Sequence, residues 1–210
     1  LIAQLDHHLG RVWAALDRLG RWEDTLVVFT SDHGDYLGDH WLGEKELFHD
    51  CIQRVPMLVF DPSREADATR GTVDDRFVEA IDVVPTILDA LECPIPAHRI
   101  EGRSLLALTR ADDKAEVAWR GAVFSELDYS YRLARRLLGR GVDACRAWMV
   151  RTQDWKYLHW QGFAPQLFDL SNDPDEFQDL GTSAAHESVR NDMHRHLFEW
   201  FCNLKRRTTV

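Results

Sequence analysis

The sequence predicts an α/β region followed by a small antiparallel sheet that packs against one helix. In the first part, amphipathic helices and short apolar runs follow in the order helix, strand, loop, strand, helix, which is typical of α/β folds. From about residue 111, short strand-like segments precede a last helix, which favours an antiparallel sheet covered on one face. We therefore expect an α/β domain over 1–110 and an α+β subdomain over 111–210.

The first elements are predicted from hydrophobic spacing. Apolar residues recur at helical spacing over 4–20, and Gly20 is a plausible helix end. The β-rich apolar runs at 25–30 and 55–60 are each typical of a strand buried on both faces of a parallel sheet. A long polar loop, 31–50, separates these two expected strands.

The later elements follow from capping and turn signals. A helix is expected over 82–91, with Asp82 as N-cap and Pro85 in the first turn. A tight turn at 153–154 and a closing helix over 184–204 are expected as well. The four strands of the C-terminal sheet are predicted at 122–127, 147–152, 155–160 and 166–170.

Composition narrows the possible partners. The 210 residues carry a formal net charge of −10, which argues against a nucleic-acid partner because phosphate binding needs a basic face. The four cysteines, Cys51, Cys93, Cys145 and Cys202, form no CxxC pair and predict neither a zinc site nor a disulfide framework. Reduced thiols favour a reducing, cytoplasmic location.

No apolar run approaches the roughly 20 residues that a membrane-spanning helix needs, so no membrane partner is expected. The chain opens at Leu1 without a signal-peptide pattern, and its true start is expected to lie upstream.

The segment Thr30-Ser31-Asp32-His33-Gly34, continued by Asp35 and His40, is the most informative part of the chain. It directly follows an expected strand, and ligands of open α/β sheets bind beyond the carboxyl ends of strands. Adjacent Asp and His side chains can offer an oxygen and a nitrogen to one cation, and Gly34 permits a sharp turn beneath them. Hydrogen bonding within a loop would explain the same two residues.

With Gly43-Glu44-Lys45 and Arg54-Val55-Pro56 downstream, this pattern resembles the sulfatases of the alkaline phosphatase superfamily, and most of all bacterial phosphonate monoester hydrolases. Further similar fragments are Asp6 to Val12, Ile81 to Leu88, Ile100 to Leu105, Trp155-Lys156-Tyr157 and Leu167 to Glu176. The resemblance covers essentially the whole chain. It implies part of an alkaline-phosphatase-like sheet with flanking helices.

The resemblance also implies roles for single residues. Asp32 and His33 would be two ligands of one divalent cation, for which calcium, magnesium or manganese suits such a hard site better than zinc. Lys45 would be catalytic, its ammonium directed at an oxygen of a small anionic ester. Asp35 and His40 would be partners of the metal ligands or simply polar loop residues, and His49-Asp50 is interpreted as structural.

In that family the nucleophile is a formylglycine made from a cysteine in a Cys-x-Pro/Ala-x-Arg setting. None of the four cysteines stands in such a setting, so no nucleophile is expected in this chain. The family's early strand, with further carboxylate ligands, also has no counterpart here. The simplest interpretation is a C-terminal portion that is inactive by itself and binds metal weakly.

Three functions remain open at this point. The first is a hydrolase of sulfate or phosphonate/phosphate esters, and the second is a non-catalytic scaffold or assembly domain of sulfatase ancestry. The third is a phosphomutase or phosphatase with a Ser or Thr nucleophile, which would need a second metal set that the sequence does not offer. The uncovered half-sheet of such a portion would favour a homo-oligomer.

Two basic clusters are interpreted as structural. Arg132, Arg135, Arg136 and Arg140 have helical spacing and are expected to form a solvated helix face that pairs with acidic neighbours. Lys205-Arg206-Arg207 is expected to complement the dipole of the last helix.

Overall fold

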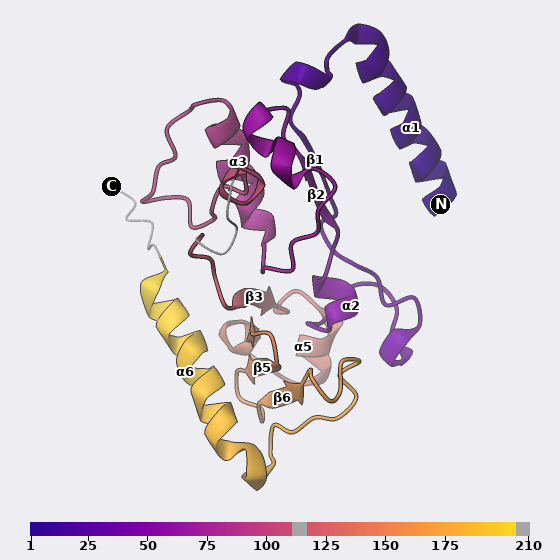
Figure 1. Ribbon diagram of the computed structural model, residues 1–210. Helices are drawn as coiled ribbons and strands as arrows, with labels where there is room; N and C mark the ends of the chain where they lie inside the picture. Colours follow the sequence, from indigo (N-terminus) through magenta and orange to yellow (C-terminus); the bar gives the residue numbers. More distant parts are fainter. Residues whose placement is uncertain (111–116, 205–210) are drawn as a thin grey trace. The chain divides into compact units, whose positions relative to one another are not determined.

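The computed structural model describes residues 1–110 and 117–204, so the Lys205–Arg207 prediction lies outside the described residues. The described residues form two compact units, which Figure 1 shows in sequence colours. Unit 1 comprises Leu1–Thr30, Pro56–Asp75 and the described part of Glu79–Ala118. Unit 2 comprises Ser31–Val55, Arg76–Val78 and the described part of Trp119–Val210.

Unit 1 confirms the predicted helices. Helix α1 (Ile2–Leu19) ends at Gly20, which adopts the left-handed φ of 63° that a glycine accepts without strain. Helix α3 (Val83–Ala90) begins after Asp82, as predicted. The Asp82 carboxylate, however, accepts the backbone N–H groups of Glu79 and Arg103. The short helix α4 (Leu106–Thr109) completes the helical part of this unit.

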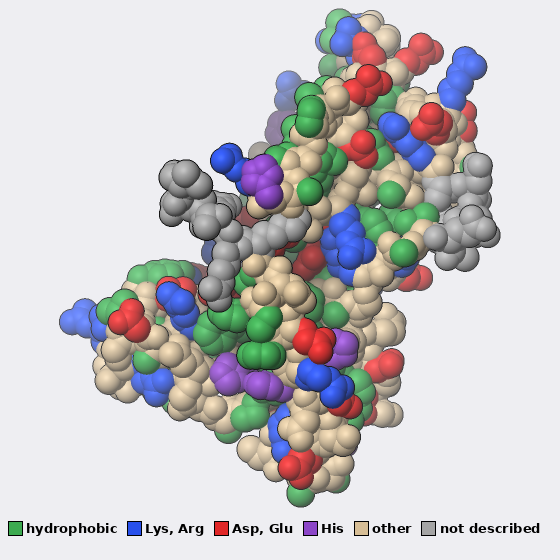
Figure 2. Space-filling view, turned by 90° about the vertical axis from the view of Figure 1, so that its left-hand side faces the viewer, with side chains coloured by type: hydrophobic (Ala, Val, Ile, Leu, Met, Phe, Trp, Pro, Cys, Tyr) green, Lys and Arg blue, Asp and Glu red, His purple; other side chains and the backbone are tan. Residues whose placement is uncertain are grey.

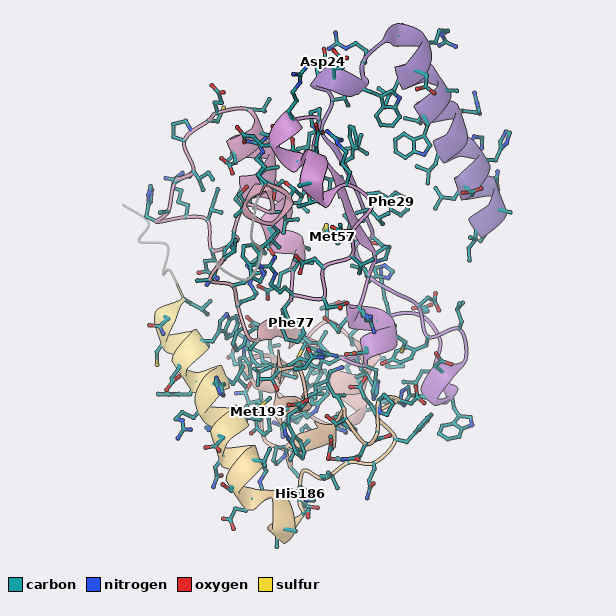
Figure 3. The ribbon with its side chains drawn as sticks, in the orientation of Figure 1. Asp24, Phe29, Met57, Phe77, His186 and Met193 are labelled. Atoms are coloured by element: carbon teal, nitrogen blue, oxygen red, sulfur yellow. The ribbon has the colours of Figure 1, made fainter. Side chains whose placement is uncertain are left out.

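The two strands of unit 1, β1 (Val27–Thr30) and β2 (Met57–Phe60), pair antiparallel, so the predicted parallel arrangement is wrong for this pair. Figure 3 labels Phe29 and Met57 on them. The strands are only partly buried, and Leu58 is 58% exposed. A short apolar run indicates a strand but carries no information on the direction of its neighbour, which explains the error.

Unit 2 contains the predicted antiparallel sheet, in the order β3-β4-β5-β6. The predicted turn at 153–154 joins β4 to β5, and α6 (Glu187–Asn203) is the expected last helix. The strands are β3 (Val123–Asp128), β4 (Arg146–Arg151), β5 (Trp155–Trp160) and β6 (Gln166–Asp169). All four lie within a residue or two of the predicted positions.

This sheet is covered on both faces, because successive side chains of a strand point to opposite sides. One face packs against α6 through Val150, Tyr157 and Leu167 of the sheet and Met193 and Leu197 of the helix. Figure 3 shows Met193 labelled on α6. The other face buries Phe48, a residue of the loop between β1 and β2, in a core formed by Ala147, Met149, Leu158, Phe168 and Leu170.

The arginine cluster does not form the solvated helix face that was predicted. Helix α5 spans only Leu133–Leu137, which is too short to place all four arginines on one face. Arg132 pairs with Glu46 at 2.7 Å, and the half-buried Arg135 and Arg140 donate to backbone carbonyls. The expected acidic pairing is found, but it attaches α5 to the loop that carries Lys45.

Candidate functional site

The loop between β1 and β2 begins with a tight turn that fixes Asp32 and His33. The His33 N–H donates to Asp32 Oδ1 at 3.1 Å, and the Ser31 hydroxyl donates to the His33 carbonyl at 2.8 Å. These bonds lie within the turn, so the adjacent pair presents its side chains from one short segment of backbone.

The Asp32 and His33 side chains point to the same place. Asp32 Oδ2 lies 3.3 Å from His33 Nε2, and the two side chains are 83% and 34% exposed. Desolvation pushes the pKa of Asp32 upward, but backbone hydrogen bonds and the nearby His33 and Lys45 hold it below its usual value. The carboxylate is thus charged, exposed and adjacent to an imidazole nitrogen.

The hydrogen bonds of His33 determine which ring nitrogen carries the proton. Nδ1 lies 2.6 Å from the Gly34 carbonyl, which can only accept, so Nδ1 is the protonated nitrogen. Nε2 lies 2.8 Å from the Lys45 ammonium, which can only donate, and 3.3 Å from the Asp32 carboxylate, which can only accept. The closer contact favours a lone pair on Nε2. This is the tautomer that a metal-binding histidine needs, with the distal N–H fixed by a backbone carbonyl.

Asp32, His33 and Lys45, which we call the candidate triad, therefore converge although Lys45 lies 12 residues beyond His33. His33 Nε2 is the meeting point, because the Lys45 ammonium lies 2.8 Å from it and Asp32 Oδ2 lies 3.3 Å from it. The donor set of a carboxylate oxygen and an imidazole nitrogen fits a hard divalent cation. Among the described residues no group of three His, Cys, Asp or Glu side chains could hold a metal ion.

Gly34 lets the triad segment lie directly against the short helix α2 (Asp50–Gln53). The Gly34 N–H donates to the Ile52 carbonyl at 2.8 Å. A Cβ at position 34 would lie only 1.9 Å from the carbonyl oxygen of Cys51, which no side chain can tolerate. The glycine is thus required for close approach to the backbone of α2.

Asp35 and His40 have other neighbours. Asp35 Oδ1 accepts the Leu37 N–H at 2.9 Å, which is a local turn bond. His40 adopts a left-handed φ of 52° and stacks on His49, with 3.9 Å between ring centroids. Whether either residue supports the metal ligands stays a prediction.

The sequence reasoning missed a group of four charges, two buried and two partly buried, that we call the charge cluster: Asp50, Arg151, Lys156 and Glu176. Lys156, which is 0% exposed, places its ammonium 2.5 Å from Asp50 Oδ1 and 2.6 Å from Glu176 Oε1. Arg151 contacts the Asp50 carboxylate at 3.1 Å. Interpreting Asp50 as structural agrees with this geometry. The only sequence signal for the others was their place in the family-like fragments around Lys156 and Glu176.

The Sulfatase family model matches residues 1–93. Over 203 residues the chain is 34% identical to the multifunctional alkaline phosphatase superfamily protein PehA of Trinickia caryophylli, which aligns with 95% of this chain. The chain belongs to the sulfatase family. Human arylsulfatase K is 30% identical over 93% of this sulfatase-family chain. The chain spans 38% of the length of PehA and 35% of that of arylsulfatase K.

Solved structures give the same assignment for this sulfatase-family chain. The phosphonate monoester hydrolase of Agrobacterium radiobacter matches with a TM-score of 0.88 and 34% identity, over 96% of this chain and 40% of that one. The expected alkaline-phosphatase-like fold is thus confirmed. None of the helices in the described part of the chain combines the length and the apolar character that spanning a membrane requires.

Proposed function

We propose that this chain is the C-terminal part of a metal-dependent hydrolase of sulfate or phosphonate/phosphate esters. The convergence of Asp32 Oδ2, His33 Nε2 and Lys45 Nζ in one loop supports the proposal most directly. A non-catalytic scaffold has no use for an exposed carboxylate, an available imidazole lone pair and an ammonium held within hydrogen-bonding distance.

In this proposal, Asp32 and His33 hold one divalent cation, for which calcium, manganese and magnesium are the candidates. The cation would neutralise the bound anion and activate the nucleophile. Lys45 turns its ammonium from His33 toward an oxygen of the small anionic ester and stabilises the charge that develops there. The formylglycine nucleophile and the remaining ligands lie outside this chain.

The proposed partners follow from charge. On the face in Figure 2, the described lysine and arginine side chains are interspersed with acidic ones and form no continuous basic stripe. Together with the net charge of −10, this favours a small ester held at a local cation over a nucleic acid. We further propose a homo-oligomer and, because all four cysteines are free thiols, a reducing cytoplasmic location.

The first test is turnover. We expect the purified chain, supplied with manganese, to hydrolyse neither an aryl sulfate nor an aryl phosphonate monoester, because two ligands hold a dication poorly. The protein encoded by a reading frame that extends upstream to a Cys-x-Pro/Ala-x-Arg motif should hydrolyse at least one of the two esters. An extended protein without that motif and without turnover would favour the scaffold alternative.

The second test assigns the residues in the extended protein. Asp32→Asn, His33→Gln and Lys45→Met should each lower kcat/KM by about 100-fold or more, as expected for loss of a ligand or a charge-stabilising group. His196→Gln and Asp143→Asn, at exposed positions of the same unit, are matched controls and should leave it unchanged. Full activity of the Asp32 and His33 variants would refute the assignment.

A further inference from the structure

The candidate triad lies on a long loop, and the structure shows a continuous set of contacts that holds this loop in place. Phe48 and Asp50 lie toward the end of the loop, where both the backbone and the side chains contact the antiparallel sheet.

The attachment begins in the charge cluster. The Lys156 ammonium of β5 donates to the Phe48 carbonyl at 3.0 Å and to the Asp50 carboxylate. Glu176 Oε2 accepts the Asp50 N–H at 2.6 Å, which satisfies a donor at the first residue of α2. The start of α2 is therefore bound by two charged side chains, Lys156 of β5 and Glu176.

Helix α2 carries the attachment on to the triad. Its residues Cys51 and Ile52 form the backbone surface on which Gly34 rests, and the Gly34 carbonyl accepts the Nδ1 proton of His33. Each step from Lys156 to His33 is a hydrogen bond or a backbone contact. A second contact, between the Tyr36 hydroxyl and His49 Nδ1 at 2.6 Å, holds the middle of the same loop.

The charges of the cluster balance within a largely buried site. Two cations, Arg151 and Lys156, face two carboxylates, Asp50 and Glu176, and the Lys156 side chain is fully buried. A buried pair of this kind adds little net stability over apolar residues of the same shape, but its attraction repays the cost of desolvation only in a good geometry. Such a cluster is suited to fixing position.

We propose that Lys156, with Asp50 and Glu176, positions the site: the charge cluster fixes α2, and α2 fixes the orientation and tautomer of the His33 ring. This rests on the proposed function, because the position of His33 matters only if its Nε2 is a ligand. It assigns the C-terminal sheet a part in the site, although none of its residues belongs to the triad.

The test is the tautomer of His33, read from ¹⁵N ring shifts of the uniformly labelled chain at pH 7.5 and assigned by loss of the signal in His33→Gln. The wild type should show protonated Nδ1 and unprotonated Nε2. The charge-matched double variant Lys156→Met/Glu176→Gln removes one cation and one anion, so that Arg151 still balances Asp50. We expect its His33 shifts to move toward the average of the two tautomers.

Met193→Ala is the control, because it leaves a cavity in the core on the opposite face of the same sheet. It should lower the unfolding midpoint while leaving the His33 shifts at their wild-type values. Wild-type His33 shifts in the folded double variant would overturn the positioning proposal. If the double variant does not fold, Glu176→Gln alone, which leaves Lys156 paired with Asp50, gives the same readout.

Failure of the positioning proposal can be distinguished from failure of the proposed function. Manganese should broaden the wild-type signals of Asp32 and His33, and failure to do so would count against the metal site alone. The tautomer shift in the double variant requires neither metal nor turnover, so it reports on positioning even then.

Discussion

Two groups of charged side chains in unit 2 each combine a lysine with a carboxylate, in opposite surroundings. In the charge cluster the Lys156 side chain is 0% exposed and the charges are matched by the chain itself. In the candidate triad Asp32 is 83% exposed, and His33 Nε2 contacts the Lys45 ammonium, on a flexible stem, and the exposed Asp32 carboxylate. The comparison teaches that buried, mutually satisfied charges hold the structure, whereas exposed charges with unused capacity can accept a ligand.

The largest expected effect is the difference in unfolding free energy between the same substitution, Lys→Met, at Lys156 and at Lys45. Lys156→Met leaves two buried carboxylates with one arginine and should lower the free energy of unfolding by about 3–5 kcal/mol. Lys45→Met, at an exposed position, should change it by less than about 0.5 kcal/mol. Urea unfolding of both variants measures the difference, and equal losses would remove the distinction between the groups.

Two glycine substitutions test whether α2 connects the charge cluster to the candidate triad. Gly34→Ala forces its Cβ against the Cys51 carbonyl and should cost about 1–3 kcal/mol of unfolding free energy. Gly43→Ala, with nothing within 4 Å of its Cβ, should be neutral within about 0.5 kcal/mol. Only the first should also move the ¹⁵N shifts of His33. Loss of stability with an unmoved His33 ring would show that α2 does not set the ring.

The pH dependence concerns a histidine beside the charge cluster. Burial, then the nearby His40 and Lys156, lower the pKa of His49 to about 4. Between pH 6.5 and about 4 the unfolded chain binds this proton and the folded chain does not, so stability should fall as pH falls, by up to about 2 kcal/mol. The pKa of Glu176 is raised, mainly by desolvation. Above the usual pKa range of a glutamate, its contribution to stability therefore falls as pH rises, opposite to that of His49.

Comparison with His49→Gln isolates the histidine contribution, because Glu176 titrates in both proteins. Unfolding measured by urea at pH 7 and pH 4.5 should show a smaller loss in the variant. An identical loss in the two proteins would mean that His49 titrates normally.

The smallest expected effect is that of the metal on the chain alone. Manganese should raise the unfolding free energy by no more than about 1 kcal/mol at millimolar concentration, because a two-ligand site binds weakly. Asp32→Asn should abolish the increase, whereas Asp143→Asn should retain it. A large increase would mean that further ligands are present in this chain.

The sequence predicts the fold well where the signals are local. Gly20 ends α1, and four strands with a two-residue turn lie close to their expected positions. The direction of β2 relative to β1 was missed because a short apolar run lacks that information. The length of α5 was missed because arginine spacing says nothing about where a helix ends.

The candidate site was likewise predictable only in part. The resemblance to sulfatases predicts that Asp32, His33 and Lys45 act together, and the three do converge, although their roles remain predictions. The charge cluster could not be predicted, because Lys156 and Glu176 lie 106 and 126 residues from Asp50. No local pattern reports a contact over such separations.

The hydrogen bond between Lys45 and His33 has a consequence for the order of events. A lone pair can serve one positive charge at a time, so an arriving cation competes with the ammonium for Nε2. In the proposed site, a cation on Nε2 would displace the Lys45 ammonium and leave it available for an anion. Without a cation, the lysine and the imidazole would stay paired, and early capture of an anion by Lys45 would be disfavoured.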